Sequence, residues 1–170
     1  MLRGVGILLV LGGCFYFGRA QVRAINRRVN ALSSILRALE IIEQELVFHL
    51  STMEELFEFA ALRSSEPASG FLRMCGKELK KDYGKPLSEI WRVAALGKLT
   101  DLKKNEMDCL LALGNVLGRY DGEWQCKSIE NARIILAQSL STAVQERKSQ
   151  GKMYSVLGAA AGAFLVILLL

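Results

Sequence analysis

Few residues in this sequence are of types that do chemistry, and those few are not spaced for it. The single histidine, His49, stands in an expected turn, and the sequence places no base or ligand partner near it. The four cysteines, at positions 14, 75, 109 and 126, form no Cys-x-x-Cys pair, which argues against zinc, iron–sulfur and thioredoxin-like sites. We therefore expect Cys75, Cys109 and Cys126 to be small buried apolar side chains and not disulfide partners.

The motifs that bind phosphate or activate a nucleophile are also missing from the sequence. It contains no Gly-x-x-x-x-Gly-Lys-Ser/Thr loop, no Gly-x-Ser-x-Gly elbow and no His-Glu-x-x-His pair. We predict a protein that is not an enzyme and has no cofactor, metal or small-molecule substrate. Any energy that it uses must then come from another protein.

Two polar groups are candidates for binding a partner. Glu43 and Glu45, with Glu40, form an acidic run that suits either a basic partner surface or a solvated helix face. Asp121 and Gln125 are four residues apart at the start of the last expected helix, where they would either hold the preceding turn or face a partner.

These groups lie between two long apolar segments. Residues 4–17 (GVGILLVLGGCFYF) and 153–170 (MYSVLGAAAGAFLVILLL) carry no charge, and each approaches the roughly 20 apolar residues that a bilayer core requires. Only Arg3 and the amino terminus precede the first segment, most basic residues follow it, and no Ala-x-Ala site closes it, which favours an uncleaved anchor over a signal peptide. We therefore predict an N-terminal transmembrane anchor at 1–18, a cytoplasmic helical bundle at 19–152 and a C-terminal transmembrane helix at 153–170.

The predicted topology follows from the flanking charges. Seven basic residues flank the two segments on the side that faces the middle of the chain: Arg19, Arg23, Arg27, Arg28, Arg147, Lys148 and Lys152. The positive-inside rule then makes the middle of the chain cytoplasmic and puts both termini outside. Residues 19–152 have a net charge of +4 with acids and bases interleaved, which indicates a solvated surface and not a nucleic-acid groove.

Small residues mark one face of the last segment. Gly158 and Gly162 make a Gly-x-x-x-Gly step, and such steps let membrane helices approach closely. This face would pack against the first segment, against a second copy of the chain in a homo-oligomer, or against another membrane protein. The alternative is a lipid-facing helix that is rich in alanine.

The spacing of apolar residues predicts an all-α fold without strands. Apolar residues recur three and four apart from Val22 to Leu46, as on one face of a long amphipathic helix. Later helices are expected from a Ser51–Glu54 capping box, from Pro67, from Pro86 to about Gly97, after a Thr100 or Asp101 cap, and from Glu123 into the last segment. The fifth of these six would contain Gly114 and Gly118, whose cost suggests close approach of a neighbouring helix.

Several runs resemble one family, the stage III sporulation protein AB of endospore-forming bacteria. They are residues 113–121 (LGNVLGRYD) with Gln125 after them, 152–158 (KMYSVLG) with Gly162 and the leucine-rich end, Trp91, and 42–46 (IEQEL). The resemblance covers nearly the whole chain and is most specific in the C-terminal half. One departure is Ser51-Thr52-Met53, where the family tends to carry Thr-Pro-Leu.

The resemblance implies a helical cytoplasmic domain similar to those of the inner-membrane platform proteins of type II secretion and type IV pilus machines. It further implies a place in the mother-cell membrane around the forespore, within the channel complex of the stage III A proteins, and contact with their cytoplasmic ATPase, protein AA. We expect a platform subunit that is required for spore formation. The alternative is a pore or transporter subunit, which the absence of ionisable side chains in both apolar segments disfavours.

Overall fold

The structure is a computed structural model that describes residues 2–48, 52–81, 84–119 and 121–169, with side chains described in 22–47, 52–81, 84–119 and 121–149. Across these residues it contains six helices and no strand, so the all-α prediction is confirmed. The helices are α1 (Leu2–Phe48), α2 (Met53–Arg63), α3 (Ala68–Lys80), α4 (Leu87–Lys98), α5 (Lys104–Gly114) and α6 (Gly122–Leu169).

The chain divides into two units. Residues Arg28–Ser141 form one compact unit, called here the body, and Met1–Arg27 with Thr142–Leu170 form a second, called the terminal unit. Both long helices belong in part to each unit, and α6 is helical without a break through Gly151.

Among the described residues, none of the helices has both the length and the apolar character needed to cross a membrane. The expected transmembrane segments, 1–18 and 153–170, lie outside the residues whose side chains are described. Both segments, and the domain boundaries drawn from them, stay predictions.

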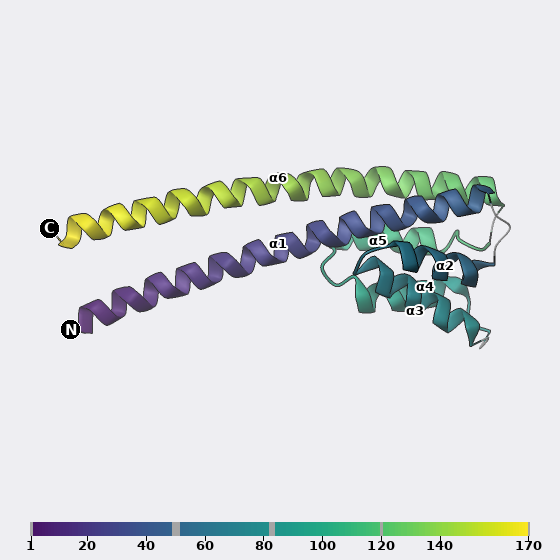
Figure 1. Cartoon of the computed structure of the whole chain (residues 1–170), viewed down its shortest axis with the longest axis horizontal. Helices are drawn as coiled ribbons and strands as arrows, with labels where there is room; N and C mark the ends of the chain where they lie inside the picture. The colour runs from purple at the N-terminus through teal and green to yellow at the C-terminus, as the bar shows by residue number, and fades with distance from the viewer. Residues whose placement is uncertain (1, 49–51, 82–83, 120, 170) are drawn as a thin grey trace. The chain divides into compact units, whose positions relative to one another are not determined.

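In the body, α1 and α6 run antiparallel and the four short helices are grouped on one side of α1 (Figure 1). The apolar face expected for the first helix is buried, with Leu32, Ile35, Leu39 and Ile42 all at most 2% exposed. On α6 the buried side chains also recur three and four apart: Ile129, Ala132 and Leu136. Each long helix therefore has one apolar stripe turned into the core, while its polar flank faces outward.

The short helices are joined around Trp91 on α4, which is fully buried. Its ring lies 4.6 Å from that of Phe71 on α3 and 5.7 Å from that of Phe57 on α2, measured between centroids. Its indole Nε1 donates a 2.8 Å hydrogen bond to the carbonyl of Leu110 on α5. One side chain thus connects α2, α3, α4 and α5.

Gly114 on α5 makes room for the Trp91 ring of α4. This is the close approach of a neighbouring helix that the glycine predicted. A Cβ atom at position 114 would lie 2.3 Å from Trp91 Cδ1, a distance that real contacts do not show. Gly118 differs from the expectation because α5 ends at Gly114 and Gly118 lies beyond it with φ = 73°. Glycine suits that left-handed backbone, which other residues adopt only with strain.

Two predicted helix starts were wrong in position. The capping box of α2 is Thr52 with Glu55, one residue after the predicted pair: Thr52 Oγ1 accepts from Glu55 N at 3.4 Å, and Glu55 Oε2 accepts from Thr52 N at 3.2 Å. The sequence allows two capping boxes, Ser51 with Glu54 or Thr52 with Glu55, because each pair has the required spacing. The burial of Leu56 and Phe57 fits the second pair, which the structure shows.

Helix α5 begins at Lys104, so neither Thr100 nor Asp101 caps it. The Glu106 carboxylate fulfils that role by accepting a 2.8 Å hydrogen bond from the Lys103 backbone N–H. In the segment before it, Leu99 is fully buried, whereas Thr100 and Lys103 are exposed.

Candidate functional site

The acidic run on α1 lies beside α6. The Glu43 carboxylate pairs with the Arg133 guanidinium of α6, and the two side chains are 24% and 33% exposed. Burial, and next the negative charge of Glu43, raises the pKa of the Cys126 thiol on α6. Glu45 is partly exposed on the same helix. Glu43 therefore helps to join the two long helices, whatever else it contacts.

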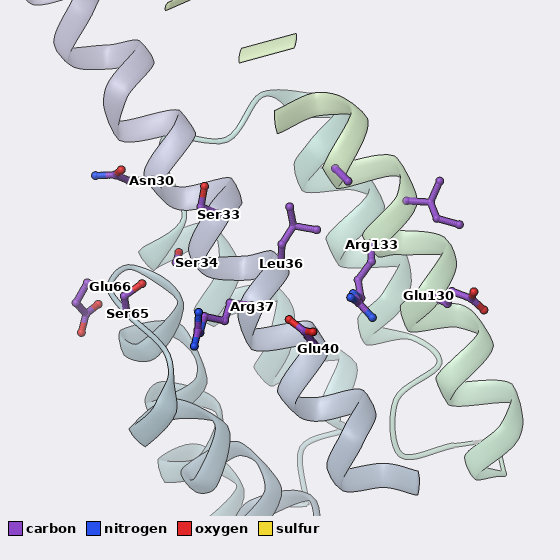
Figure 2. Close-up of a pocket in the computed structure, with 12 residues that line it drawn as sticks. Asn30, Ser33, Ser34, Leu36, Arg37, Glu40, Ser65, Glu66, Glu130 and Arg133 are labelled. Atoms are coloured by element: carbon purple, nitrogen blue, oxygen red, sulfur yellow. The ribbon is translucent and has the colours of Figure 1, made fainter. Parts of the chain in front are cut away.

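An open groove of about 890 Å³ lies next to this ion pair. Its floor is the polar flank of α1, and its two walls are the turn between α2 and α3 and the flank of α6 (Figure 2). The lining residues are Asn30, Ser33, Ser34, Leu36, Arg37, Glu40, Ser65, Glu66, Glu130, Arg133, Ile134 and Ala137. All of them belong to the body.

The spacing of the lining residues suits a helical occupant. On α1 the exposed positions 30, 33, 37 and 40 recur three and four apart, and on α6 positions 130, 134 and 137 do the same. Two such rows form ridges against which another helix packs. Ser33 and Ala137 are small, and Ile134 is 51% exposed, so the groove offers room for close approach and one apolar contact.

The charges in the groove are mixed. Arg37 extends toward the turn that carries Ser65 and Glu66, while Arg133 extends from α6 toward α1 (Figure 2). The Glu66 carboxylate is held in place because it accepts a 3.1 Å hydrogen bond from Gly70 N. Within the part of the chain that is described, Arg37 and Glu40 have no ion pair or hydrogen-bond partner. They are therefore available to a charged partner surface.

The groove is poorly suited to chemistry on a small molecule. Small-molecule sites are generally enclosed, whereas this groove is open and most of its lining residues are charged or carry a hydroxyl group. No group of three or more His, Cys, Asp or Glu side chains that could hold a metal ion occurs among the described residues. Mixed charge on an open helical surface favours binding of a protein segment.

The second candidate pair, Asp121 and Gln125, lies at the turn before α6. Asp121 Oδ1 accepts a 3.1 Å hydrogen bond from Trp124 N, which is the geometry of a helix N-cap. Gln125 is 6% exposed, and its Oε1 accepts from Gly118 N at 3.1 Å. Asp121 thus caps α6, and Gln125 joins the turn that follows α5 to the first turn of α6.

A buried ion pair was missed from the sequence. Arg28 on α1 and Glu106 on α5 are 7% and 0% exposed, and Arg28 Nη2 lies 2.5 Å from Glu106 Oε1. Arg28 Nε also donates to the same carboxylate at 3.1 Å. A signal was present: Arg28 is four residues before Leu32 and Glu106 is four before Leu110, so each continues a buried apolar stripe.

The remaining candidates divide by position. Gly158 and Gly162 lie outside the residues whose side chains are described, as does His49, so their assignments stay predictions. The described cysteines, Cys75, Cys109 and Cys126, form no disulfide; Cys75 is buried as expected, whereas Cys109 and Cys126 are only partly buried. Burial raises the pKa of Cys75 to about 12, so this thiol keeps its proton at neutral pH.

Comparison with known proteins identifies the family of the chain. The family model described as stage III sporulation protein AB matches residues 3–170. Stage III sporulation protein AB of Bacillus subtilis (strain 168) is 24% identical over 177 residues, and the match covers 100% of both chains. A solved structure of a stage III sporulation protein AB has a similar fold, with a TM-score of 0.65 and 22% identity over 72% of this chain and 98% of the other. The chain therefore belongs to the stage III sporulation protein AB family, and its role is in sporulation.

Proposed function

We propose that this protein is a non-enzymatic platform subunit of the sporulation channel complex and that its body docks the cytoplasmic ATPase of the stage III A proteins. The observation that carries the proposal is the groove on α1 and α6, where Arg37 and Glu40 are exposed and lack partners among the described residues. A helix of the ATPase with opposite charges at the matching positions would fit such a surface.

The proposed site changes the roles of the acidic candidates. Because Glu43 pairs with Arg133, it would hold that guanidinium at the groove wall instead of meeting the ATPase itself. Glu45 stays a proposed contact beyond the groove. Asp121 and Gln125 would act indirectly, by holding the turn from which α6 starts.

The two long helices suggest how docking would have an effect in the membrane. α1 and α6 each begin or end in an apolar segment that we propose to be an anchor, with both termini outside and the body in the mother-cell cytoplasm. Because each helix is unbroken from the body into its apolar segment, a displacement of the body would pass along it. Gly158 and Gly162 would then provide the face on which the last segment packs against other channel proteins.

A charge exchange in sporulating cells tests the proposal. The variant Arg37→Glu/Glu40→Lys reverses both charges in the groove and leaves the net charge unchanged. The control, Glu89→Lys/Arg92→Glu, makes the same exchange at the same spacing on an exposed face of α4. We expect the groove variant to lose ATPase recruitment to the membrane fraction and to lower the spore count, with no change for the control. Normal recruitment by the groove variant would exclude this docking surface.

A further inference from the structure

The net charge of the protein is concentrated in the terminal unit. That unit contains 7 of the 22 basic residues and 1 of the 17 acidic residues, a net charge of +6. The body contains the other 15 basic and 16 acidic residues, a net charge of −1. The division of the fold between residues 27 and 28 and between 141 and 142 is therefore also a division of charge.

Acids are scarce among the basic residues of the terminal unit, whose one acidic residue, Glu146, stands next to Arg147. The first acidic residue of the chain is Glu40, and none follows Glu146. Basic residues that outnumber the acids seven to one create a local positive potential, in contrast to the mixed surface of the body.

The positions of these charges follow the helices. Residues 19, 23 and 27 are spaced four apart on α1, so they form one stripe, and 148 and 152 have the same spacing on α6. Arg23, Arg147 and Lys148, whose side chains are described, are all exposed.

The basic residues on both helices lie close enough to the proposed anchors to attract lipid headgroups. With a helical rise of about 1.5 Å per residue, Arg23 is about 8 Å along α1 from residue 18. Lys148 and Arg147 are about 8 and 9 Å along α6 from residue 153. The Debye length is about 8 to 10 Å at physiological salt, so charges at these positions still attract an anionic headgroup.

We infer that the basic residues of the terminal unit that lie between the two proposed anchors, which excludes Arg3, form a binding site for anionic phospholipid, which selects the lipids around the two membrane segments. This inference rests on the proposed membrane anchoring. It adds that the protein distinguishes phosphatidylglycerol from phosphatidylcholine through Arg23, Arg147 and Lys148 together with the adjoining basic residues.

The test uses the full chain in nanodiscs of phosphatidylcholine that contain a trace of spin-labelled phosphatidylglycerol or spin-labelled phosphatidylcholine. We expect the anionic lipid to associate about fivefold more strongly, the factor that one basic residue near an anionic surface contributes. The variant Arg23→Gln/Arg147→Gln/Lys148→Gln should lose most of this preference. The control Lys77→Gln/Lys98→Gln/Lys104→Gln removes the same charge from exposed positions of the body and should retain it.

Three results would overturn the inference: equal association of the two lipids with the wild-type chain, an undiminished preference in the terminal-unit variant, or equal losses in both variants. Displacement of the lipid by inorganic phosphate, beyond the effect of sodium chloride at equal ionic strength, would assign the site to free phosphate instead. Alkaline carbonate extraction separates the two proposals. A chain that resists extraction but shows no lipid preference contradicts only this inference, whereas a chain that is extracted contradicts the anchoring itself.

Discussion

The contact between Gly114 and Trp91 allows a sharp test of how the body is held together. In Gly114→Ala the new Cβ would lie 2.3 Å from Trp91 Cδ1 and 2.7 Å from Trp91 Cγ. The indole cannot move away freely, because the rings of Phe57 and Phe71 pack against it and its Nε1 bonds to Leu110 O. The substitution therefore forces α4 and α5 apart or displaces a fully buried ring.

Three effects set the expected change in the free energy of unfolding of Gly114→Ala. Overpacking a well-filled core costs about 1 to 3 kcal/mol. Weakening the hydrogen bond of the Trp91 indole adds about 1 kcal/mol. Replacing glycine by alanine within a helix returns about 1 kcal/mol. We expect a net loss of about 2 kcal/mol, measured as the free energy of urea unfolding of the full chain in detergent and followed by tryptophan fluorescence.

Gly97→Ala is the matched control, because it makes the same substitution near the end of α4, where an added Cβ meets nothing within 4 Å. It should leave stability unchanged or raise it by up to about 1 kcal/mol. In a Trp91→Phe background, Gly114→Ala should cost less, because the smaller ring leaves room for the methyl group. Equal effects at positions 97 and 114, or the same cost in both backgrounds, would refute the packing argument.

Three further predictions concern the remaining polar and buried groups. Arg28→Met should lower the free energy of urea unfolding by about 3 to 5 kcal/mol, because it leaves the Glu106 carboxylate buried without its cation. The double variant Arg28→Met/Glu106→Leu should recover most of that loss. A single variant as stable as the double variant would contradict this. Gln125→Ala should cost about 1 kcal/mol through loss of the acceptor for Gly118 N, whereas Gln145→Ala, at an exposed position of the same helix, should leave stability unchanged; equal losses in the two variants would contradict the role of this hydrogen bond. The Cys75 thiol has a pKa of about 12 in the folded chain and about 9.0 in the unfolded chain. The free energy of unfolding should therefore be unaffected by this group below pH 9 and should fall above pH 9 by about 1.4 kcal/mol per pH unit. If the free energy of unfolding of the wild type falls no more steeply between about pH 9 and 10.5 than that of Cys75→Ala, the prediction is wrong.

Periodicity was sufficient to predict the helices, since positions such as Leu32 and Ile35 carry a signal within a few residues. The exact helix starts were harder to predict, because Ser51 and Thr52 are both good caps and only the packing of Leu56 decides between them. The helix start at Lys104 depends on a glutamate whose place is fixed by a distant arginine.

Contacts between distant segments account for most of what the sequence did not reveal. Glu43 reads as a surface acid on its own helix, and its partner Arg133 is 90 residues away. The groove likewise depends on the α2–α3 turn lying across α1 from α6, which no local pattern encodes. By contrast, Gly114 could be flagged in advance because glycine within a helix is costly without a packing reason.

Calorimetric titration of the full chain in detergent with the purified stage III A ATPase tests the central claim most directly. The account predicts saturable binding that Arg37→Glu/Glu40→Lys abolishes and that Glu89→Lys/Arg92→Glu leaves intact. No binding by the wild-type chain across a range of salt concentrations would contradict the docking function. Equal binding by all three proteins would contradict its assignment to the groove.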